Sequence, residues 1–106
     1  MNNNTQEADT LDLEQHRQEI VNEMLAEHGP NWAEHYAPGT LGCHELLDRT
    51  INAAETVEQY VLSHPACAQN PEWYALAEQA VAALNELYQR VGAEHLAEKG
   101  DEAAHP

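Results

Sequence analysis

Residues 70–96 are the part of the chain that most constrains its fold, because they carry the apolar periodicity of one long α-helix. One row of apolar residues recurs there at steps of three and four: Trp73, Ala77, Ala80, Leu84, Leu87 and Val91. A second row lies beside it and repeats every seven residues: Tyr74, Val81, Tyr88 and His95. An apolar face this wide needs at least two other helices to cover it, so the stretch predicts a helical bundle.

The ends of this helix are marked by residues with strong terminal preferences. Asn70 can cap the helix, and Pro71 suits the first helical position, where a missing N–H has no cost. Gly92 weakens the helix, but the apolar phase continues beyond it. We therefore expect the helix to reach about Ala97 and to stop at Gly100.

Two further stretches have helical patterns and complete the predicted bundle. One spans about residues 9–28 and ends at Gly29, which is followed by proline. The other spans about residues 43–62 and ends before Pro65. Its connection to the third helix is short, so these two should form an antiparallel hairpin, with Trp73 closing the core. The predicted fold is all-α, a compact three-helix bundle made of this hairpin and the N-terminal helix.

The linker of residues 29–42 combines a helix signal with two aromatic residues. Asn31 and Glu34 have the spacing of a capping box, which predicts a short helical turn. Trp32 and Tyr36 would then lie on one side of that turn. We expect them to pack on the core, because a linker seldom holds two aromatics unless they pin the chain. The alternative is an exposed interaction patch, which includes the interface of a homodimer.

The boundaries of the domain follow from composition. Residues 1–8 are polar and without pattern, which predicts a disordered tail, and residues 100–106 are predicted to be a second flexible tail. Residues 9–99 then form a single domain. The N-terminus lacks the pattern of a secretory signal, and no apolar run approaches the ~18 residues of a membrane helix. With only two cysteines, the chain is expected to be cytoplasmic, with reduced thiols and no membrane contact.

Charge is the outlying property of the composition. The sequence has 19 Asp and Glu against 4 Lys and Arg, a formal net charge of −15. Such a surface repels nucleic acid, whose binding depends on Lys and Arg that release counterions. Three interpretations of the acidity remain: a well-solvated surface, adaptation to high salt, and a docking surface for a basic protein.

The candidate docking surface is a row of acidic side chains on the first predicted helix. Four of them line the side opposite the apolar residues and form what we call the acidic ridge: Asp12, Glu19, Glu23 and Glu27. Like charges four residues apart destabilise a helix, so local helix preference did not select this row. The ridge predicts a small non-catalytic protein-binding module, of the adaptor or inhibitor type, that engages a basic protein surface. In its extreme form, such a module mimics nucleic acid towards its basic partner.

Histidine and cysteine residues supply the alternative, a domain that binds zinc or a similar divalent metal. With helices running up, down and up, five of these residues would gather at one end of the bundle: His28, His35, Cys43, His44 and His95. Their spacing matches no closed ligand pattern, and ordinary capping and core roles also explain them. A catalytic site is not expected, because Cys43 and His44 are neighbours that point about 100° apart on a helix.

Overall fold

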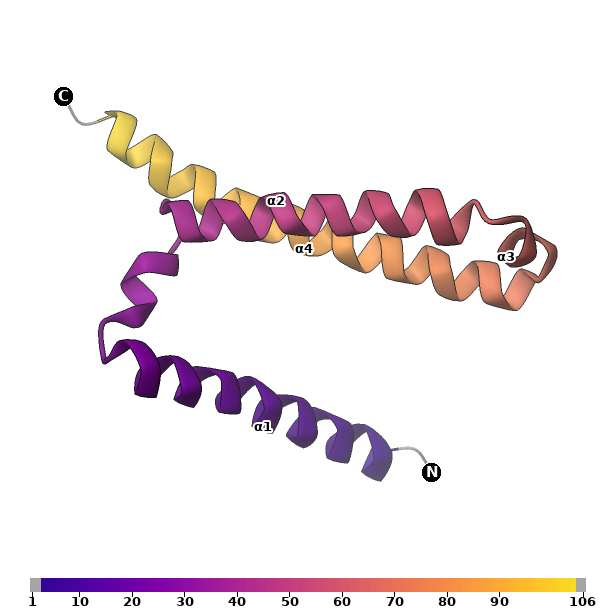
Figure 1. Ribbon diagram of the computed structural model, residues 1–106, viewed down its shortest axis with the longest axis horizontal. Coiled ribbons are helices and arrows are strands. Elements are labelled where there is room, and N and C mark those ends of the chain that lie inside the picture. Colours follow the sequence, from indigo (N-terminus) through magenta and orange to yellow (C-terminus); the bar gives the residue numbers. More distant parts are fainter. Residues whose placement is uncertain (1–2, 105–106) are drawn as a thin grey trace. The chain divides into compact units, whose positions relative to one another are not determined.

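The computed structural model describes the backbone of residues 3–104 and the side chains of residues 10–98. Every regular element in that range is a helix, which confirms the all-α prediction for this part of the chain. None of these helices is both long and apolar enough to cross a membrane. In chain order the elements are α1 (Asn3–His28), η1 (Trp32–Tyr36), α2 (Leu41–Thr56), η2 (Val57–Leu62), α3 (Pro65–Gln69) and α4 (Pro71–Ala104) (Figure 1).

The chain divides into two units, Met1–Glu34 and His35–Pro106. The first unit is dominated by α1, whose backbone ends as predicted: Gly29 has a φ of +85° and donates its N–H to the carbonyl of Leu25 at 2.9 Å. A positive φ is readily adopted by glycine alone, which is why the helix stops there. Apolar side chains of α1 are exposed, Ile20 to 61%. The helix therefore presents an apolar sector as well as an acidic one.

The second unit is built on an antiparallel hairpin, in which α2 and α4 lie side by side (Figure 1). The buried residues of α2 are Cys43, Leu47, Thr50 and Ala54, at steps of four, three and four. On α4, Val81 and His95 are buried, and the half-buried residues on the same side are Ala77, Leu84, Asn85, Val91 and Gly92. Steps of three and four on both helices are the packing pattern of a coiled coil. The hairpin predicted from residues 43–96 is thus present.

The buried side of α4 differs from the prediction in its rotation about the helix axis. It is centred on the row that contains Val81 and His95, whereas Trp73 and Leu87 of the other row are exposed. Trp73 is 58% exposed, so the prediction that it closes the core was wrong. A single neighbouring helix covers one seam, which takes Val81 and His95 from the seven-residue row and half-buries Ala77, Leu84 and Val91 of the other row. The flank of α4 that carries Leu87 is left open within this unit.

Capping residues fix both ends of the hairpin. Thr40 caps α2 by accepting the N–H of Cys43 on its Oγ1 at 3.3 Å. Asn70 caps α4 as predicted: its Oδ1 accepts the N–H groups of Glu72 at 3.0 Å and Trp73 at 3.2 Å. Each bond satisfies a backbone donor that the first turn of a helix leaves unpaired.

Helix α4 continues through Gly92, as predicted, but also through Gly100 to Ala104. The stop predicted at Gly100 was therefore wrong, since a glycine weakens a helix without forcing it to end. At the other terminus α1 begins at Asn3. Parts of both predicted tails thus have helical backbone, and residues 1–2 and 105–106 lie outside the described residues.

The turn of the hairpin contains two short elements that the sequence did not predict. The second helix reaches Leu62 as expected, but its last six residues, η2, are wound as a π-helix. Ser63 donates its N–H to the carbonyl of Glu58, five residues earlier, at 3.1 Å. The short helix α3 follows and is capped by His64, whose Nδ1 accepts the N–H of Ala66 at 3.0 Å.

Candidate functional site

The acidic ridge lies on α1, and all four of its side chains are exposed. Their spacing of seven, four and four residues keeps them on one side of the helix. Glu27 has a histidine neighbour, with His28 Nε2 at 3.7 Å from its Oε2. Among the side chains of residues 10–98, no arginine lies within ion-pair distance of Asp12, Glu19 or Glu23. Three exposed carboxylates of the ridge therefore have no arginine beside them in this described range.

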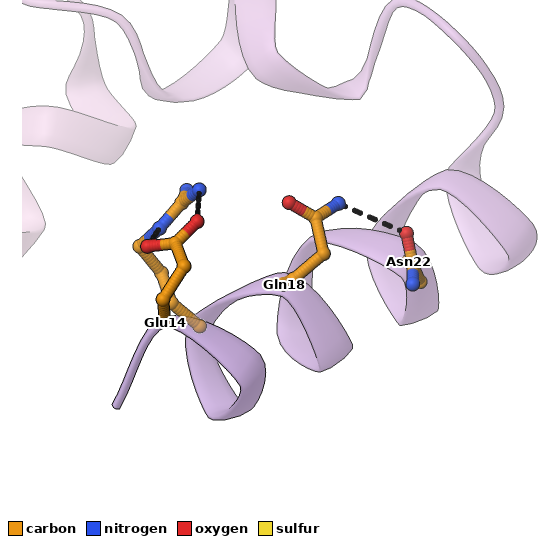
Figure 2. A network of polar contacts seen from close by, with 4 residues as sticks. Glu14, Gln18 and Asn22 are labelled. Carbon is orange, nitrogen blue, oxygen red and sulfur yellow. Dashed lines mark hydrogen bonds and ion pairs between the residues drawn. The ribbon is translucent and has the colours of Figure 1, made fainter. Parts of the chain in front are cut away.

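The arginine of α1 is engaged elsewhere on the same helix. Arg17 donates both Nε and Nη2 to the carboxylate of Glu14, with Nε at 2.9 Å from Oε2, and Gln18 donates to Asn22 Oδ1 at 3.1 Å (Figure 2). The hydrogen bond from Arg17, and then its charge, lower the pKa of Glu14 below its ordinary value. These polar pairs run along α1 outside the acidic ridge, so they leave its charge uncompensated.

The same arrangement recurs in the second unit. Arg49 pairs with Glu45 at 3.3 Å on α2, and Arg90 pairs with Glu86 at 2.8 Å on α4. Every arginine of the chain is thus bound to a glutamate three or four residues earlier on its own helix, the favourable order for such pairs. Each exposed pair adds at most about 0.5 kcal/mol to stability. Their larger effect is on the surface field, since they neutralise three of the four Lys and Arg of the sequence.

Trp32 and Tyr36, the linker aromatics, form the two ends of η1, a 3₁₀ turn that matches the predicted helical turn. Trp32 is half-buried and Tyr36 is 51% exposed. The Tyr36 ring lies against the backbone of Gly42 in the first turn of α2. Tyr36 is therefore held against the start of the hairpin while keeping half of its surface accessible. This contact favours pinning over a freely exposed patch at that residue.

Of the histidine and cysteine residues of the metal alternative, two histidines of the second unit meet. His28 belongs to the first unit, Cys43 is buried in the hairpin seam, and the side chain of His35 is exposed. His44 and His95 do meet: their ring centroids are 5.8 Å apart, with planes tilted by 37°. Within the described residues no three of the His, Cys, Asp and Glu side chains are placed to hold a metal ion.

An apolar groove at the tip of the hairpin was missed by the sequence analysis. It encloses about 510 Å³ between η2, α3 and the start of α4. Its lining residues are Tyr60, Val61, His64, Ala66, Cys67, Trp73, Leu76 and Ala77. The sequence feature that could have indicated the groove is Trp73, which directly precedes Tyr74 and so lies beside the seven-residue row, outside the seam. Because Trp73 was predicted to be in the core, no groove was expected beside it.

The two cysteines are the candidate nucleophiles among the described residues. Cys43 is buried and Cys67 half-buried, both as free thiols, and neither is hydrogen-bonded to a histidine in the described part of the chain. A cysteine nucleophile needs such a base or another source of positive charge. Comparisons add no template: no family model, no curated protein and no solved structure matches this chain.

Proposed function

We propose that this protein is a non-catalytic protein-binding module that docks on a basic protein surface through the acidic ridge of α1. The observation that carries the proposal is the absence of any described arginine beside Asp12, Glu19 and Glu23, all of which are exposed. Opposite charge across an interface steers association and fixes its register. The net charge of −15 makes nucleic acid and anionic membranes unfavourable partners.

The binding mode would be that of a helix presenting one face to its partner. Steps of four residues place Glu19, Glu23 and Glu27 about 6 Å apart along the axis of α1. Such a regular row of negative charge is the property that an inhibitor or adaptor of this kind would share with a nucleic acid backbone. Neighbouring carboxylates repel one another, and a row of Lys or Arg on the partner would relieve that repulsion.

The proposal includes a compact three-helix bundle, in which α1 covers the open flank of the hairpin. Each unit by itself supports this arrangement: α1 carries an exposed apolar sector that includes Ile20, and α4 has an exposed flank that includes Leu87. The apolar sector of α1 borders the acidic ridge, since Ile20 and Glu27 are seven residues apart. Asp12 and Glu19 lie farther round the helix, so they could engage a partner while Ile20 packs. The free thiols of Cys43 and Cys67 fit a reducing, cytoplasmic location.

The alternative metal-binding function is favoured by one observation, the approach of His44 and His95. A zinc site needs three or four ligands, so a second histidine pair or a carboxylate would have to join them. Elemental analysis of the untagged protein, together with the effect of a chelator on its melting temperature, tests this function. A bound metal whose removal lowers the melting temperature would establish it.

Charge reversal on the ridge tests the docking function. The probe is a synthetic arginine-rich peptide, and affinity is measured by titration calorimetry at low and at high salt. We expect Glu19→Lys with Glu23→Lys to weaken binding at least about tenfold, and high salt to weaken it for the wild type.

The matched control is Glu55→Lys with Glu78→Lys, which changes the net charge equally at exposed positions of α2 and α4. It should weaken binding less than about threefold, the effect of net charge alone. An equal loss of affinity in both double variants would mean that the peptide responds to the net charge alone. The proposal that the acidic ridge is the docking surface would then be wrong.

A further inference from the structure

A long-range hydrogen bond attaches the turn before α2 to the C-terminal half of α4. His95 is 2% exposed, and its Nδ1 accepts the backbone N–H of Gly39 at 2.8 Å across 56 residues of sequence. Gly39 has a φ of +91°, and a Cβ at this position would lie 3.0 Å from the Cβ of Glu98. Glycine thus allows both the turn and the close approach that this bond requires.

The chemistry of the bond fixes the protonation state of His95. A backbone N–H can donate but not accept, so Nδ1 must carry no proton, and the imidazole is the neutral tautomer with its proton on Nε2. An imidazolium would direct an N–H of its own at the N–H of Gly39. The bond therefore exists in one protonation state of His95 and is replaced by repulsion in the other.

The surroundings of His95 add charges of both signs. From α2, His44 faces it at 5.8 Å between ring centroids, and the positive end of the helix dipole lies close by, since α2 begins at Leu41. From α4 itself, Tyr88 lines a surface depression that His44 and His95 also line, and Glu98 lies against the Gly39 turn. A protonated His44 would oppose a second positive charge on His95, while the Glu98 carboxylate would favour one.

We propose that the His95–Gly39 pair is a pH-sensitive latch, which holds the turn at residues 37–40 on α4 and opens on acidification. Below the ordinary histidine value of about 6.5, an unlatched His95 binds a proton that the latched form excludes. The open form therefore takes up more protons than the closed form, and the stability of the latch falls as the pH falls. This inference is independent of the acidic ridge.

Opening the latch would act on the turn that precedes α2 within the second unit. The turn leads directly into Thr40, whose Oγ1 caps α2 and also donates to the carbonyl of Ala37 at 2.7 Å. Loss of the Gly39 contact would loosen this turn, although Tyr36 still lies against Gly42, while the hairpin seam around Leu47 and Val81 stays packed. Acid would thus loosen the start of the second unit without unfolding the hairpin.

Nuclear magnetic resonance of the full chain tests the latch. The imidazole nitrogen shifts of His95 and the exchange protection of the Gly39 amide are followed from about pH 7.5 to about pH 4.5. We expect an unprotonated Nδ1 at the upper end, and a loss of Gly39 protection of about fivefold to tenfold as His95 protonates. The amides of Thr50 and Val81, in the hairpin seam, should keep their protection over the same range.

Two variants separate the latch from general effects of acid. His95→Asn places an oxygen acceptor where Nδ1 lies but cannot titrate, so Gly39 should stay protected at low pH. His44→Asn removes the neighbouring imidazole and should leave the pH-dependent loss in place. If His95→Asn does not fold, the wild type and His44→Asn still decide the matter. A protonated Nδ1 at neutral pH, a His95 that does not titrate, or Gly39 protection that ignores its titration would each overturn the proposal.

Discussion

Leu47 of α2 lies opposite Gly92 of α4, such that a Cβ built on Gly92 would meet Leu47 Cδ2 at 3.6 Å. That separation is an ordinary van der Waals contact, so the seam has room for a methyl group. Gly92 is also helical, where glycine is about 1 kcal/mol less favourable than alanine. We expect Gly92→Ala to raise the free energy of unfolding by about 0.5–1 kcal/mol, as measured by urea denaturation. A lower stability would show that the seam is tighter than this distance indicates.

Gly39 should respond to the same substitution in the opposite direction. Its φ of +91° is unfavourable for alanine, and the added Cβ would lie 3.0 Å from Glu98 Cβ. Gly39→Ala should therefore lower the free energy of unfolding by about 1–2 kcal/mol. Gly29→Ala is the matched control, since Gly29 has a φ of +85° with no atom within 4 Å of its added Cβ. Gly29→Ala therefore measures the cost of the positive φ alone. If it lowers the free energy of unfolding as much as Gly39→Ala does, the contact with Glu98 contributes nothing to the loss.

The helix boundaries that could be predicted are those set by local hydrogen bonds. Asn70, Thr40 and Gly29 act within three or four residues of themselves, so the sequence contains the information needed to place them. Gly100 was misjudged because continuation of a helix depends on the sum of many small preferences. The π-helical turn η2 contacts α3 and α4, and local periodicity does not encode such contacts.

The rotation of α4 could not be predicted for a related reason. Both of its apolar rows satisfy helical periodicity, and only the position of α2 decides that Val81 is buried while Leu87 is exposed. The approach of His44 to His95 likewise depends on how two helices cross. By contrast, the acidic ridge could be read from residue spacing alone, because exposure of carboxylates on one side of a single helix needs no tertiary partner.

The Asn70 cap provides a third prediction. Its Oδ1 accepts two backbone N–H groups, which Asn70→Ala would leave to solvent. We expect the free energy of unfolding to fall by about 1 kcal/mol, with Asn70→Asp retaining most of the wild-type value because a carboxylate caps equally well. Thermal denaturation followed by circular dichroism measures both. Equal losses for alanine and aspartate would show that the amide acts through other contacts.

Burial on α4 predicts a contrast between two apolar residues. Val81 is 7% exposed in the seam, whereas Leu96 is 68% exposed. Val81→Ala should lower the free energy of unfolding by about 1–2 kcal/mol, since it removes buried methyl groups, and Leu96→Ala should change it by less than about 0.5 kcal/mol. Chemical denaturation of both variants gives the comparison. A larger loss at Leu96 would mean that the seam does not lie on the side of α4 that carries Val81.

The proposed packing of α1 is tested by a substitution in its apolar sector. Ile20→Ala increases helix propensity, so in an unpacked α1 it would leave stability unchanged or slightly improved. If α1 covers the open flank of the hairpin, the same change removes buried methyl groups and lowers the free energy of unfolding by about 2–4 kcal/mol. We expect the loss, measured by chemical denaturation of the full chain. Glu19→Ala, one residue away on the acidic ridge, should be nearly neutral, and a neutral Ile20→Ala would contradict the three-helix bundle while leaving the hairpin intact.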